Sequence, residues 1–371
     1  YYKMRKICIL LPDLRGGGAE RLNILLANYW HSSGIKVDVV LMKKQGRLIN
    51  LLSPKISVID LDTKKIRNTI PRIVKYLKQS RPDVVLSAMW PLTSAAIIAW
   101  LFSGKIGKLF TSDHIVLSIE CMKNIVIPLP LLAFSLKTTY RYADGIIAVS
   151  LGVKKDLCSI SGLSENKVKV IYNPVSQARE IPCISISERK KLWGSDFCYN
   201  ILAVGSLKLQ KDYETLLKAF SLMSSDISAK LVILGDGPLR TDIEKIILQL
   251  GLQKKVVLHG FCLDPYPWYL TADLFVLSSQ WEGFGNVIVE ALECGTPVVS
   301  TNCPSGPSEI LENGKYGTLV PVGDYIKLSN AMAGSLIQEH DKFLLRKRAD
   351  DFSVSIISGQ YLDYFKLSQD V

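Results

Sequence analysis

The side chains best placed for chemistry lie in one short segment, residues 279–292. It holds two glutamates, Glu282 and Glu290, with seven residues between them and a Gly-x-Gly turn, Gly283 to Gly285, directly after the first. The preceding apolar run predicts a strand, and the residues after the turn predict a helix that contains Glu290. Bare backbone N–H groups at such a helix N-terminus favour a diphosphate. Glu290 can then chelate ribose hydroxyls, while Glu282 accepts hydrogen bonds from a sugar.

A second glycine cluster, Gly16, Gly17 and Gly18, follows the first predicted strand and precedes Arg21. Three glycines allow a tight turn and a close approach of ligand to backbone. A plain tight turn explains the same residues. The cluster lacks the G-x-G-x-x-G pattern, and lysines end the second predicted strand where a nicotinamide cofactor needs an acidic residue.

These motifs resemble those of glycosyltransferase family 4, whose members have the GT-B fold. The spacing of Glu282 and Glu290 is similar to the family signature, and residues 205–213 resemble its loop where an Arg and a Lys grip the donor pyrophosphate. Residues 235–239 and 259–261 occupy the next strand ends. Residues 305–310 resemble a variant common among members that use UDP-hexoses or UDP-N-acetylhexosamines. The resemblance covers nearly the whole chain.

The resemblance implies a retaining enzyme that moves a sugar from a UDP-sugar to a glycan or lipid-linked acceptor in surface polysaccharide or glycolipid synthesis. The implied catalytic residues are Lys211, Glu282 and His114. The implied donor-binding residues are Ser206, Lys211, Gly260, Phe261, Glu282, Gly283, Phe284, Gly285, Asn286, Val287 and Glu290. The implied acceptor-binding residues are Gly17, Gly18 and Arg21.

The expected mechanism relies on charge. Lys211 and the amides of residues 283–286 would stabilise the departing diphosphate without a proton transfer to it. The acceptor would attack from the front face, since we find no strong candidate for a covalent nucleophile. The four histidines are not at metal-ligand spacing and no C-x-x-C pair occurs, so we expect neither a metal nor a cofactor.

One position departs from the family pattern. Ser206 stands where the family usually has Arg, which leaves Lys211 as the one cation of that loop at its expected place. A non-catalytic sugar-nucleotide binder therefore stays open as an alternative. So does a UDP-sugar epimerase or a phosphorylase of the same fold.

Strand and helix patterns alternate along the chain, which predicts an α/β fold of two Rossmann-like domains facing a cleft. We expect an acceptor domain over residues 1–175, a nucleotide-sugar domain over 176–350 and a final helix in 351–371 that crosses back. Residues 176–188 are expected to form a linker. The predicted strands are Ile7–Leu11, Val37–Met42, Ile56–Leu61, Val84–Met89, Lys108–Thr111, Gly145–Val149, Val168–Ile171, Ile201–Gly205, Lys230–Gly235, Val256–Gly260, Leu274–Ser278, Pro297–Thr301 and Thr318–Val320.

The charge is unevenly distributed. Residues 1–175 hold 26 Lys and Arg against 11 Asp and Glu, whereas residues 176–371 hold 19 against 23. The basic half predicts an anionic partner, and we expect a membrane surface that presents the acceptor. Residues 66–78, with apolar residues at helical spacing among basic ones, and the uncharged run 125–136 are the candidate contacts. Packing of both segments into the core is the alternative, and no ribonucleoprotein motif or zinc finger supports a nucleic-acid partner.

The location follows from two further features. The eight cysteines are expected to be reduced thiols, mostly buried, in a cytosolic protein. We find no secretory signal, and the uncharged stretch 84–104 is broken by Pro91, which favours a buried strand and helix over a membrane span. We therefore expect a cytoplasmic protein, peripheral on the inner face of the cytoplasmic membrane.

Overall fold

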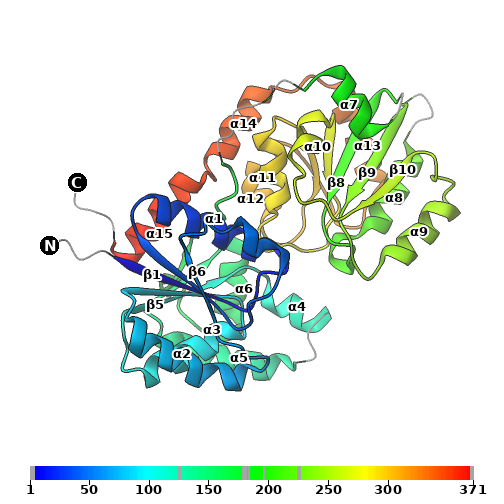
Figure 1. The fold of residues 1–371 in the computed structure, drawn as a ribbon. Coiled ribbons are helices and arrows are strands. Elements are labelled where there is room, and N and C mark those ends of the chain that lie inside the picture. Colours follow the sequence, from blue (N-terminus) through cyan, green and yellow to red (C-terminus); the bar gives the residue numbers. More distant parts are fainter. Residues whose placement is uncertain are drawn as a thin grey trace. The chain divides into compact units, whose positions relative to one another are not determined.

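The structure, a computed structural model, describes residues 5–123, 127–177, 182, 184–194, 197–223 and 227–367. Its contacts divide the chain into two units, one of Tyr1–Pro174 with Val354–Val371 and the other of Val175–Ser353 (Figure 1). These divisions fall within three residues of the boundaries expected from the sequence. The last segment of the chain belongs to the first unit.

The first unit is built on a seven-stranded sheet in the order β3-β2-β1-β4-β5-β6-β7, with every pair parallel. Most strands are nearly continuous runs of buried apolar residues, as expected when helices cover both faces. All seven predicted strands are confirmed. They are β1 (Lys6–Leu11), β2 (Lys36–Leu41), β3 (Ser57–Asp60), β4 (Val84–Ala88), β5 (Lys108–Asp113), β6 (Gly145–Ala148) and β7 (Val168–Val170).

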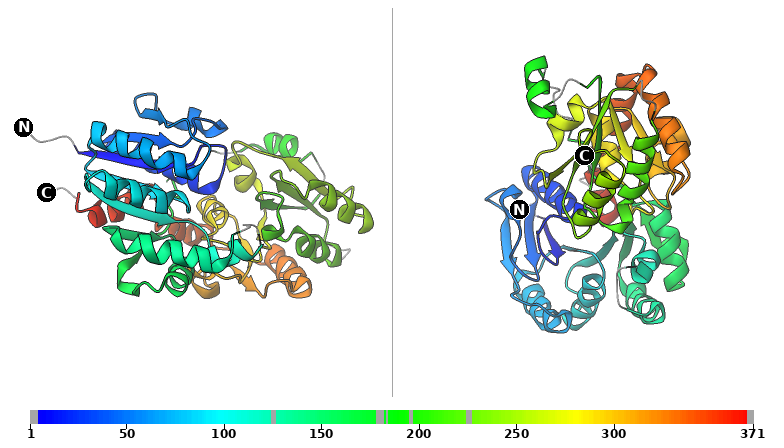
Figure 2. Two further views of the ribbon diagram at one scale, coloured as in Figure 1. Left: turned by 90° about the horizontal axis from the view of Figure 1, so that it is seen from below. Right: turned by 90° about the vertical axis from the view of Figure 1, so that its right-hand side faces the viewer.

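Helices cover this sheet on both faces. Those described are α1 (Gly18–Ser32), α2 (Ile66–Ser80), α3 (Leu92–Phe102), α4 (Leu117–Lys123), α5 (Leu129–Thr139), α6 (Leu151–Ser161) and α15 (Val354–Phe365). Helices α1 and α15 lie together on one face, and α3 lies between α2 and α5 on the other (Figures 1 and 2). Strand β4 and helix α3 confirm the expected reading of residues 84–104.

Aromatic packing fixes α15 to the first unit. Trp30 on α1 lies with its ring centroid 6.0 Å from those of Tyr361 and Phe365. Phe110 on β5 lies 4.6 Å from Phe365. Burial of each large side chain contributes about 1.5–3 kcal/mol, so the final helix is part of this core.

The second unit holds a six-stranded parallel sheet in the order β10-β9-β8-β11-β12-β13, and all six predicted strands are confirmed. They are β8 (Tyr199–Val204), β9 (Ala229–Leu234), β10 (Val256–Gly260), β11 (Leu274–Leu277), β12 (Val298–Thr301) and β13 (Thr318–Val320). The helices are α7 (Ile186–Trp193), α8 (Tyr213–Leu222), α9 (Arg240–Gln249), α10 (Tyr266–Thr271), α11 (Asn286–Glu293), α12 (Pro307–Ile310), α13 (Tyr325–Ile337) and α14 (Lys342–Asp350).

The expected linker over residues 176–188 is only partly right. The backbone N–H groups of Val175 and Ser176 both donate to the Phe352 carbonyl, at 3.0 and 3.2 Å. The entry to the second unit therefore lies beside its exit. Helix α7 begins at Ile186, inside the expected linker, and Ser185 caps it in a reciprocal capping box with Glu188. Residues 178–181 and 183 lie outside the described part.

The segment 66–78 forms α2, which buries its apolar face in the first unit. Ile73, Tyr76 and Leu77 are buried, whereas Arg67 and Arg72 are exposed. The packing alternative is therefore right for this helix, and its basic side chains face solvent. Most of the run 125–136 forms α5, whose Leu132 and Leu136 are buried; residues 125 and 126 lie outside the described part.

Two further expectations concern membrane spans and cysteines. Across the described ranges, no helix is both long and apolar enough to cross a bilayer. The seven cysteines that the structure describes are free thiols; four are buried, and Cys198 is exposed.

Candidate active site

The motif around Glu282 occupies the carboxyl end of β11, where ligands bind in open α/β sheets. Residues 278–285 form the connection to α11, which Gly285 caps with a positive φ of 98°. Such a φ suits glycine, and no side chain caps this helix end. The turn residues Gly283, Phe284 and Gly285 are buried, and the next two, Asn286 and Val287, are half-buried.

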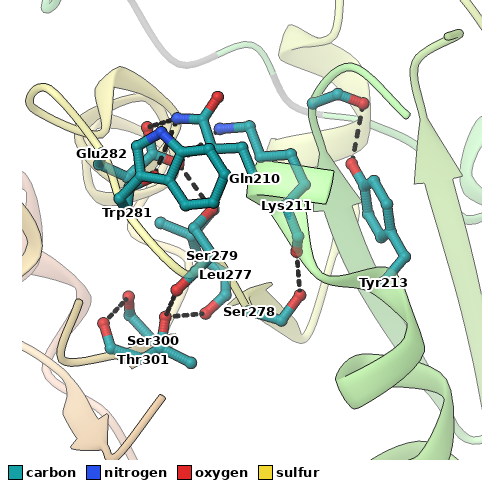
Figure 3. Close-up of polar contacts among 11 residues, drawn as sticks. Gln210, Lys211, Tyr213, Leu277, Ser278, Ser279, Trp281, Glu282, Ser300 and Thr301 are labelled. Atoms are coloured by element: carbon teal, nitrogen blue, oxygen red, sulfur yellow. Dashed lines mark hydrogen bonds and ion pairs between the residues drawn. The ribbon is translucent and has the colours of Figure 1, made fainter. Parts of the chain in front are cut away.

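A buried ion pair forms the centre of the site (Figure 3). The Nζ atom of Lys211 lies 2.6 Å from Oε1 of Glu282, and the two side chains are only 14% and 8% exposed. Lys211 ends a short 3-10 turn, η4 (Leu209–Lys211), after β8. The ends of β8 and β11, adjacent strands, thus bring together two of the three predicted catalytic residues.

Two residues that the sequence did not single out complete the surroundings of Glu282. Ser279 donates from Oγ to Oε1 of Glu282 at 2.6 Å. Gln210 donates from Nε2 to the Trp281 carbonyl at 2.9 Å and lies 3.4 Å from Oε2 of Glu282. Gln210 precedes Lys211, and Ser279 lies three residues before Glu282. Their closeness in sequence to predicted site residues was the one feature that could have indicated them. The Glu282 carboxylate is therefore held by three side chains.

Further bonds fix the backbone that carries the ion pair. Ser278 donates from Oγ to the Lys211 carbonyl at 2.7 Å. Thr301 on β12 donates from Oγ1 to the Ser279 carbonyl at 2.6 Å (Figure 3). Burial, followed by the nearby Glu282 charge, raises the pKa of Cys303 to about 12, so this thiol is neutral at physiological pH.

Glu290 lies on α11 with a different partner. Tyr269 of α10 donates from its hydroxyl to Oε2 of Glu290 at 2.8 Å. The tyrosine ring is buried while Glu290 is half-buried, so one face of the carboxylate is fixed by the protein. No local sequence pattern predicts this contact, because it depends on how α10 packs against α11.

Close backbone approaches shape the strand ends around Ser206, which is exposed. A Cβ atom on Gly235 would lie 2.0 Å from the Gly205 carbonyl oxygen, so the loops after β8 and β9 require glycine there. The Gly235 N–H donates to the Gly260 carbonyl at 2.8 Å. This bond links the loop after β9 to the end of β10. Phe261, the next residue, is exposed.

The segment 305–310 packs on the glycine turn. A Cβ atom on Gly306 would lie 1.8 Å from the Phe284 carbonyl oxygen, and its φ of 96° also favours glycine. Ser305 donates from Oγ to the Gly283 carbonyl at 2.8 Å. The two sequence motifs therefore form one structural unit at the start of α11.

In the first unit, His114 follows β5 and its Nε2 lies 2.9 Å from the Ser112 hydroxyl. Burial lowers the pKa of His114 to about 4, so the ring is neutral at physiological pH. Its Nδ1 atom has no hydrogen-bond partner in the described part of the chain. Burial raises the pKa of the adjacent Asp113 to about 7, against a smaller opposing effect of the Tyr140 hydroxyl, which donates at 3.0 Å.

The predicted acceptor residues lie at the start of α1. Gly17 is the N-cap, and its carbonyl accepts the Arg21 N–H at 3.2 Å. A Cβ atom on Gly17 would lie 2.1 Å from Oε2 of Glu20, so a side chain there would require the Glu20 carboxylate to move. Gly18 is the first residue of the helix. The ends of β1 and β5 share one edge of the sheet, so these residues and His114 lie on the same edge.

Two family models match the chain, Glycosyltransferase Family 4 over residues 16–179 and Glycosyl transferases group 1 over residues 197–350. The chain is 30% identical to the lipopolysaccharide 1,6-galactosyltransferase of Escherichia coli, over 74% of this chain and 72% of that one. It is 27% identical to a Campylobacter jejuni enzyme, N-acetylgalactosamine-N,N'-diacetylbacillosaminyl-diphospho-undecaprenol 4-alpha-N-acetylgalactosaminyltransferase, over 86% and 87% of the two chains. Among solved structures, Anabaena Alr3699/HepE in complex with UDP-glucose has a TM-score of 0.81 at 22% identity, covering 97% of this chain and 99% of that one.

The paired sheets and the matched models define a glycosyltransferase with the GT-B fold. Within that class the chain belongs to glycosyltransferase family 4. The expected fold and the expected enzyme class are thereby confirmed. The roles assigned to individual residues stay predictions.

Proposed function

We propose that this enzyme transfers a hexose or N-acetylhexosamine from a UDP-sugar with retention of configuration. The observation that carries the proposal is the buried pair of Lys211 and Glu282 beside the glycine-rich start of α11. A buried cation and the positive end of a helix dipole are suited to a leaving diphosphate, whose negative charge grows in the transition state. The similar structure of Anabaena Alr3699/HepE in complex with UDP-glucose supports the choice of donor.

Four side chains have separate roles in the proposed transfer. Lys211 stabilises the β-phosphate as the glycosidic bond breaks, and no proton transfer to the diphosphate is needed. Glu290, held by Tyr269, binds the ribose hydroxyls. Glu282 orients Lys211 and accepts a hydrogen bond from the sugar. His114, neutral because burial lowers its pKa to about 4, positions the sugar without bringing a positive charge.

The decisive experiment measures UDP affinity by calorimetry and UDP release with a panel of UDP-sugars. Glu290→Ala is expected to weaken UDP binding by about 1.5–3 kcal/mol, because it removes hydrogen bonds to a charged group. Glu244→Ala, an exposed glutamate on α9, is the matched control. Equal UDP affinity in both variants and the parent would exclude the assigned donor site.

The same assay separates the alternatives. Release of UDP only when an acceptor is added supports transfer. Conversion of the sugar without UDP release is the epimerase result, and binding without turnover is the result for a non-catalytic binder. We also propose that catalysis uses no metal, so turnover after EDTA treatment is expected to equal that of the untreated enzyme.

The acceptor is proposed to be a growing glycan carried on a lipid. The name of the Campylobacter jejuni relative includes a diphospho-undecaprenol-linked sugar, and that of the Escherichia coli relative a lipopolysaccharide. The net positive charge of residues 1–175 fits an acceptor or surface that is anionic.

We further propose that α4 and α5 contact an anionic membrane on the cytoplasmic side. Met122, Leu131 and Phe134 are 70%, 58% and 65% exposed, although their side chains are large and apolar. Lys123 and Lys137 accompany them and are also exposed. Apolar side chains with neighbouring lysines are typical of segments that lie in a bilayer interface.

Co-sedimentation with phospholipid vesicles tests this contact. Leu131→Ser with Phe134→Ser is expected to reduce binding to anionic vesicles at low salt several-fold. Ile337→Ser with Phe343→Ser, two exposed apolar residues of the second unit, is the matched control. A parent protein that fails to sediment with anionic vesicles at low salt would refute the membrane contact and leave the transferase assignment intact.

A further inference from the structure

The first unit carries a strongly positive hollow of about 600 Å³ after β3, at the start of α2. Its lining residues are Asp62, Thr63, Lys64, Lys65, Arg67, Asn68, Pro71 and Arg72. Four of them are cations and one is a carboxylate. The hollow lies at the carboxyl edge of the sheet, the edge where ligands bind in this type of fold. None of its residues belongs to the donor or acceptor sites described above.

The cations have no partner of their own in the parts of the chain that the structure describes. The side chains of Lys64, Lys65, Arg67 and Arg72 are exposed, and no ion pair or hydrogen bond holds any of them there. This contrasts with Lys6 and Arg15 in the same unit, which lie 2.7 and 2.8 Å from aspartate oxygens. The charges of the hollow are thus available to a ligand.

Their placement is also unfavourable for the isolated protein. Lys65 is the N-cap of α2, no side chain caps this helix end, and its first turn holds no acidic residue. The positive end of the helix dipole therefore faces Lys65 and Arg67, whereas an acidic residue would stabilise it. An arrangement that costs stability in the free protein is explained if an anion binds there.

The loop that carries the cations is fixed rather than loose. The buried hydroxyls of Thr63 and Thr69 lie 2.7 Å apart, and the Thr63 N–H donates to the Met42 carbonyl at 2.8 Å. The neighbouring loop adds Lys44, whose backbone N–H donates to Oδ1 of Asp60 at 3.1 Å. A fixed backbone reduces the conformational entropy that the loop loses when a ligand binds.

We propose that this hollow binds the diphosphate of the lipid-linked acceptor. The inference rests on the proposed function for the acceptor's class and adds the residues that recognise it. A diphosphate diester keeps a negative charge on each phosphorus at neutral pH, and several separate cations around an open hollow suit two adjacent phosphates. Arg67 and Arg72 supply forked donors, and Lys64 and Lys65 supply point charges.

The test measures the affinity of inorganic pyrophosphate by calorimetry with saturating UDP present, so that the donor site is occupied. The variant is Lys65→Gln with Arg67→Gln. The matched control is Lys75→Gln with Lys78→Gln, which removes the same charge from exposed positions further along α2. Loss of charge-assisted hydrogen bonds predicts about 10-fold or more weaker pyrophosphate binding in the first variant. The control is expected to change affinity less than about 2-fold.

The other arms separate the sources of phosphate. The parent is expected to bind pyrophosphate more tightly than inorganic phosphate; equal affinities would overturn the diphosphate assignment. Three other results would also overturn it. The first is an equal loss of pyrophosphate affinity in the two variants, and the second is a parent that does not bind pyrophosphate. The third is a Lys65→Gln with Arg67→Gln variant that loses binding to anionic vesicles while its pyrophosphate affinity is unchanged. Failure of the proposed function is a separate result, since it appears as absence of UDP binding in all three proteins.

Discussion

At the scale of single residues, the site depends on how the charge of Lys211 is held. Its Nζ atom shares Oε1 of Glu282 with the Ser279 hydroxyl, so the carboxylate already accepts a second donor. An ammonium has three protons, and one contact leaves the others for a phosphate. Glu282 therefore orients Lys211 and leaves N–H groups of the ammonium that can contact a phosphate.

This geometry predicts the effect of breaking the pair. Lys211→Ala is expected to lower turnover by about 10²-fold or more, as for other lost donors to transition-state charge. It also leaves Glu282 buried without its cation, which destabilises the fold by about 1–3 kcal/mol because Ser279 and Gln210 still donate. Turnover and thermal unfolding of the variant measure the two effects.

The double variant Lys211→Ala with Glu282→Gln is the control. It removes the unpaired charge, so it should recover stability relative to Lys211→Ala while turnover stays low. A double variant less stable than Lys211→Ala would mean that the pair does not carry the coupling described here.

Asp113 predicts a pH dependence of stability. The group is 2% exposed, and burial raises its pKa to about 7. The folded state therefore binds the proton more tightly than the unfolded chain, whose pKa is near 3.9. The associated stability is fully present below about pH 4 and is lost as pH rises through about 7.

Asp113→Asn cannot ionise and should escape this loss. Its thermal midpoint relative to the parent is expected to rise between pH 5 and pH 8, by the equivalent of roughly 2–3 kcal/mol. His114→Gln is the control. The pKa of His114 in the parent is depressed to about 4, so the imidazole lowers the parent's stability as pH falls below 6.5, which is the opposite pH dependence. A difference between Asp113→Asn and parent that does not vary with pH would contradict the buried, protonated carboxyl.

Some residues of the site could be predicted from the sequence and others could not. Lys211 and Glu282 were predicted because their motifs have fixed spacing along the chain. Tyr269 was not, since its bond to Glu290 requires the packing of two helices that no local pattern specifies. Gln210 lies next to Lys211, but only the register between β8 and β11 turns its amide toward Trp281.

At the scale of elements, strands were easy to predict and the surroundings of helices were not. Buried parallel strands are short apolar runs between turns, so all thirteen were located from sequence. Helix α2 shows the difficulty. Its alternation of apolar and basic residues fits both a membrane surface and a packed helix, and the buried Ile73 and Leu77 decide for packing.

The start of α2 predicts a conflict between stability and binding. Lys65→Gln with Arg67→Gln removes two cations from the positive end of the helix dipole. The free energy of unfolding should rise by about 0.5–1 kcal/mol in the absence of ligand. Lys75→Gln with Lys78→Gln should not raise it, because Lys78 lies in the last turn, where cations are favourable. Urea denaturation at low salt compares the two, and equal stabilities would show that the dipole term is negligible here.

At the scale of the whole molecule, the chain path makes the first unit depend on its last segment. The chain leaves this unit at Pro174 and returns at Val354, whereas the second unit is continuous. The returning helix supplies Tyr361 and Phe365 to the core around Trp30. A change at the C-terminus therefore affects the first unit, although the second unit precedes it in sequence.

Truncation after Ser353 should unfold the first unit and spare the second. It removes three fully or almost fully buried side chains, Ile357, Tyr361 and Phe365, each worth about 1.5–3 kcal/mol. Their sum is comparable to the total stability of a domain, about 5–15 kcal/mol. Calorimetry should show one lost transition, and UDP should still raise the midpoint of the remaining one.

A matched pair on α15 isolates packing from mere shortening, because Ile357 is 0% and Ile356 is 47% exposed. Ile357→Ala should cost about 2–5 kcal/mol and Ile356→Ala less than about 0.5 kcal/mol. If the truncated chain keeps both transitions, or the two alanine variants are equally stable, α15 is not part of the first core.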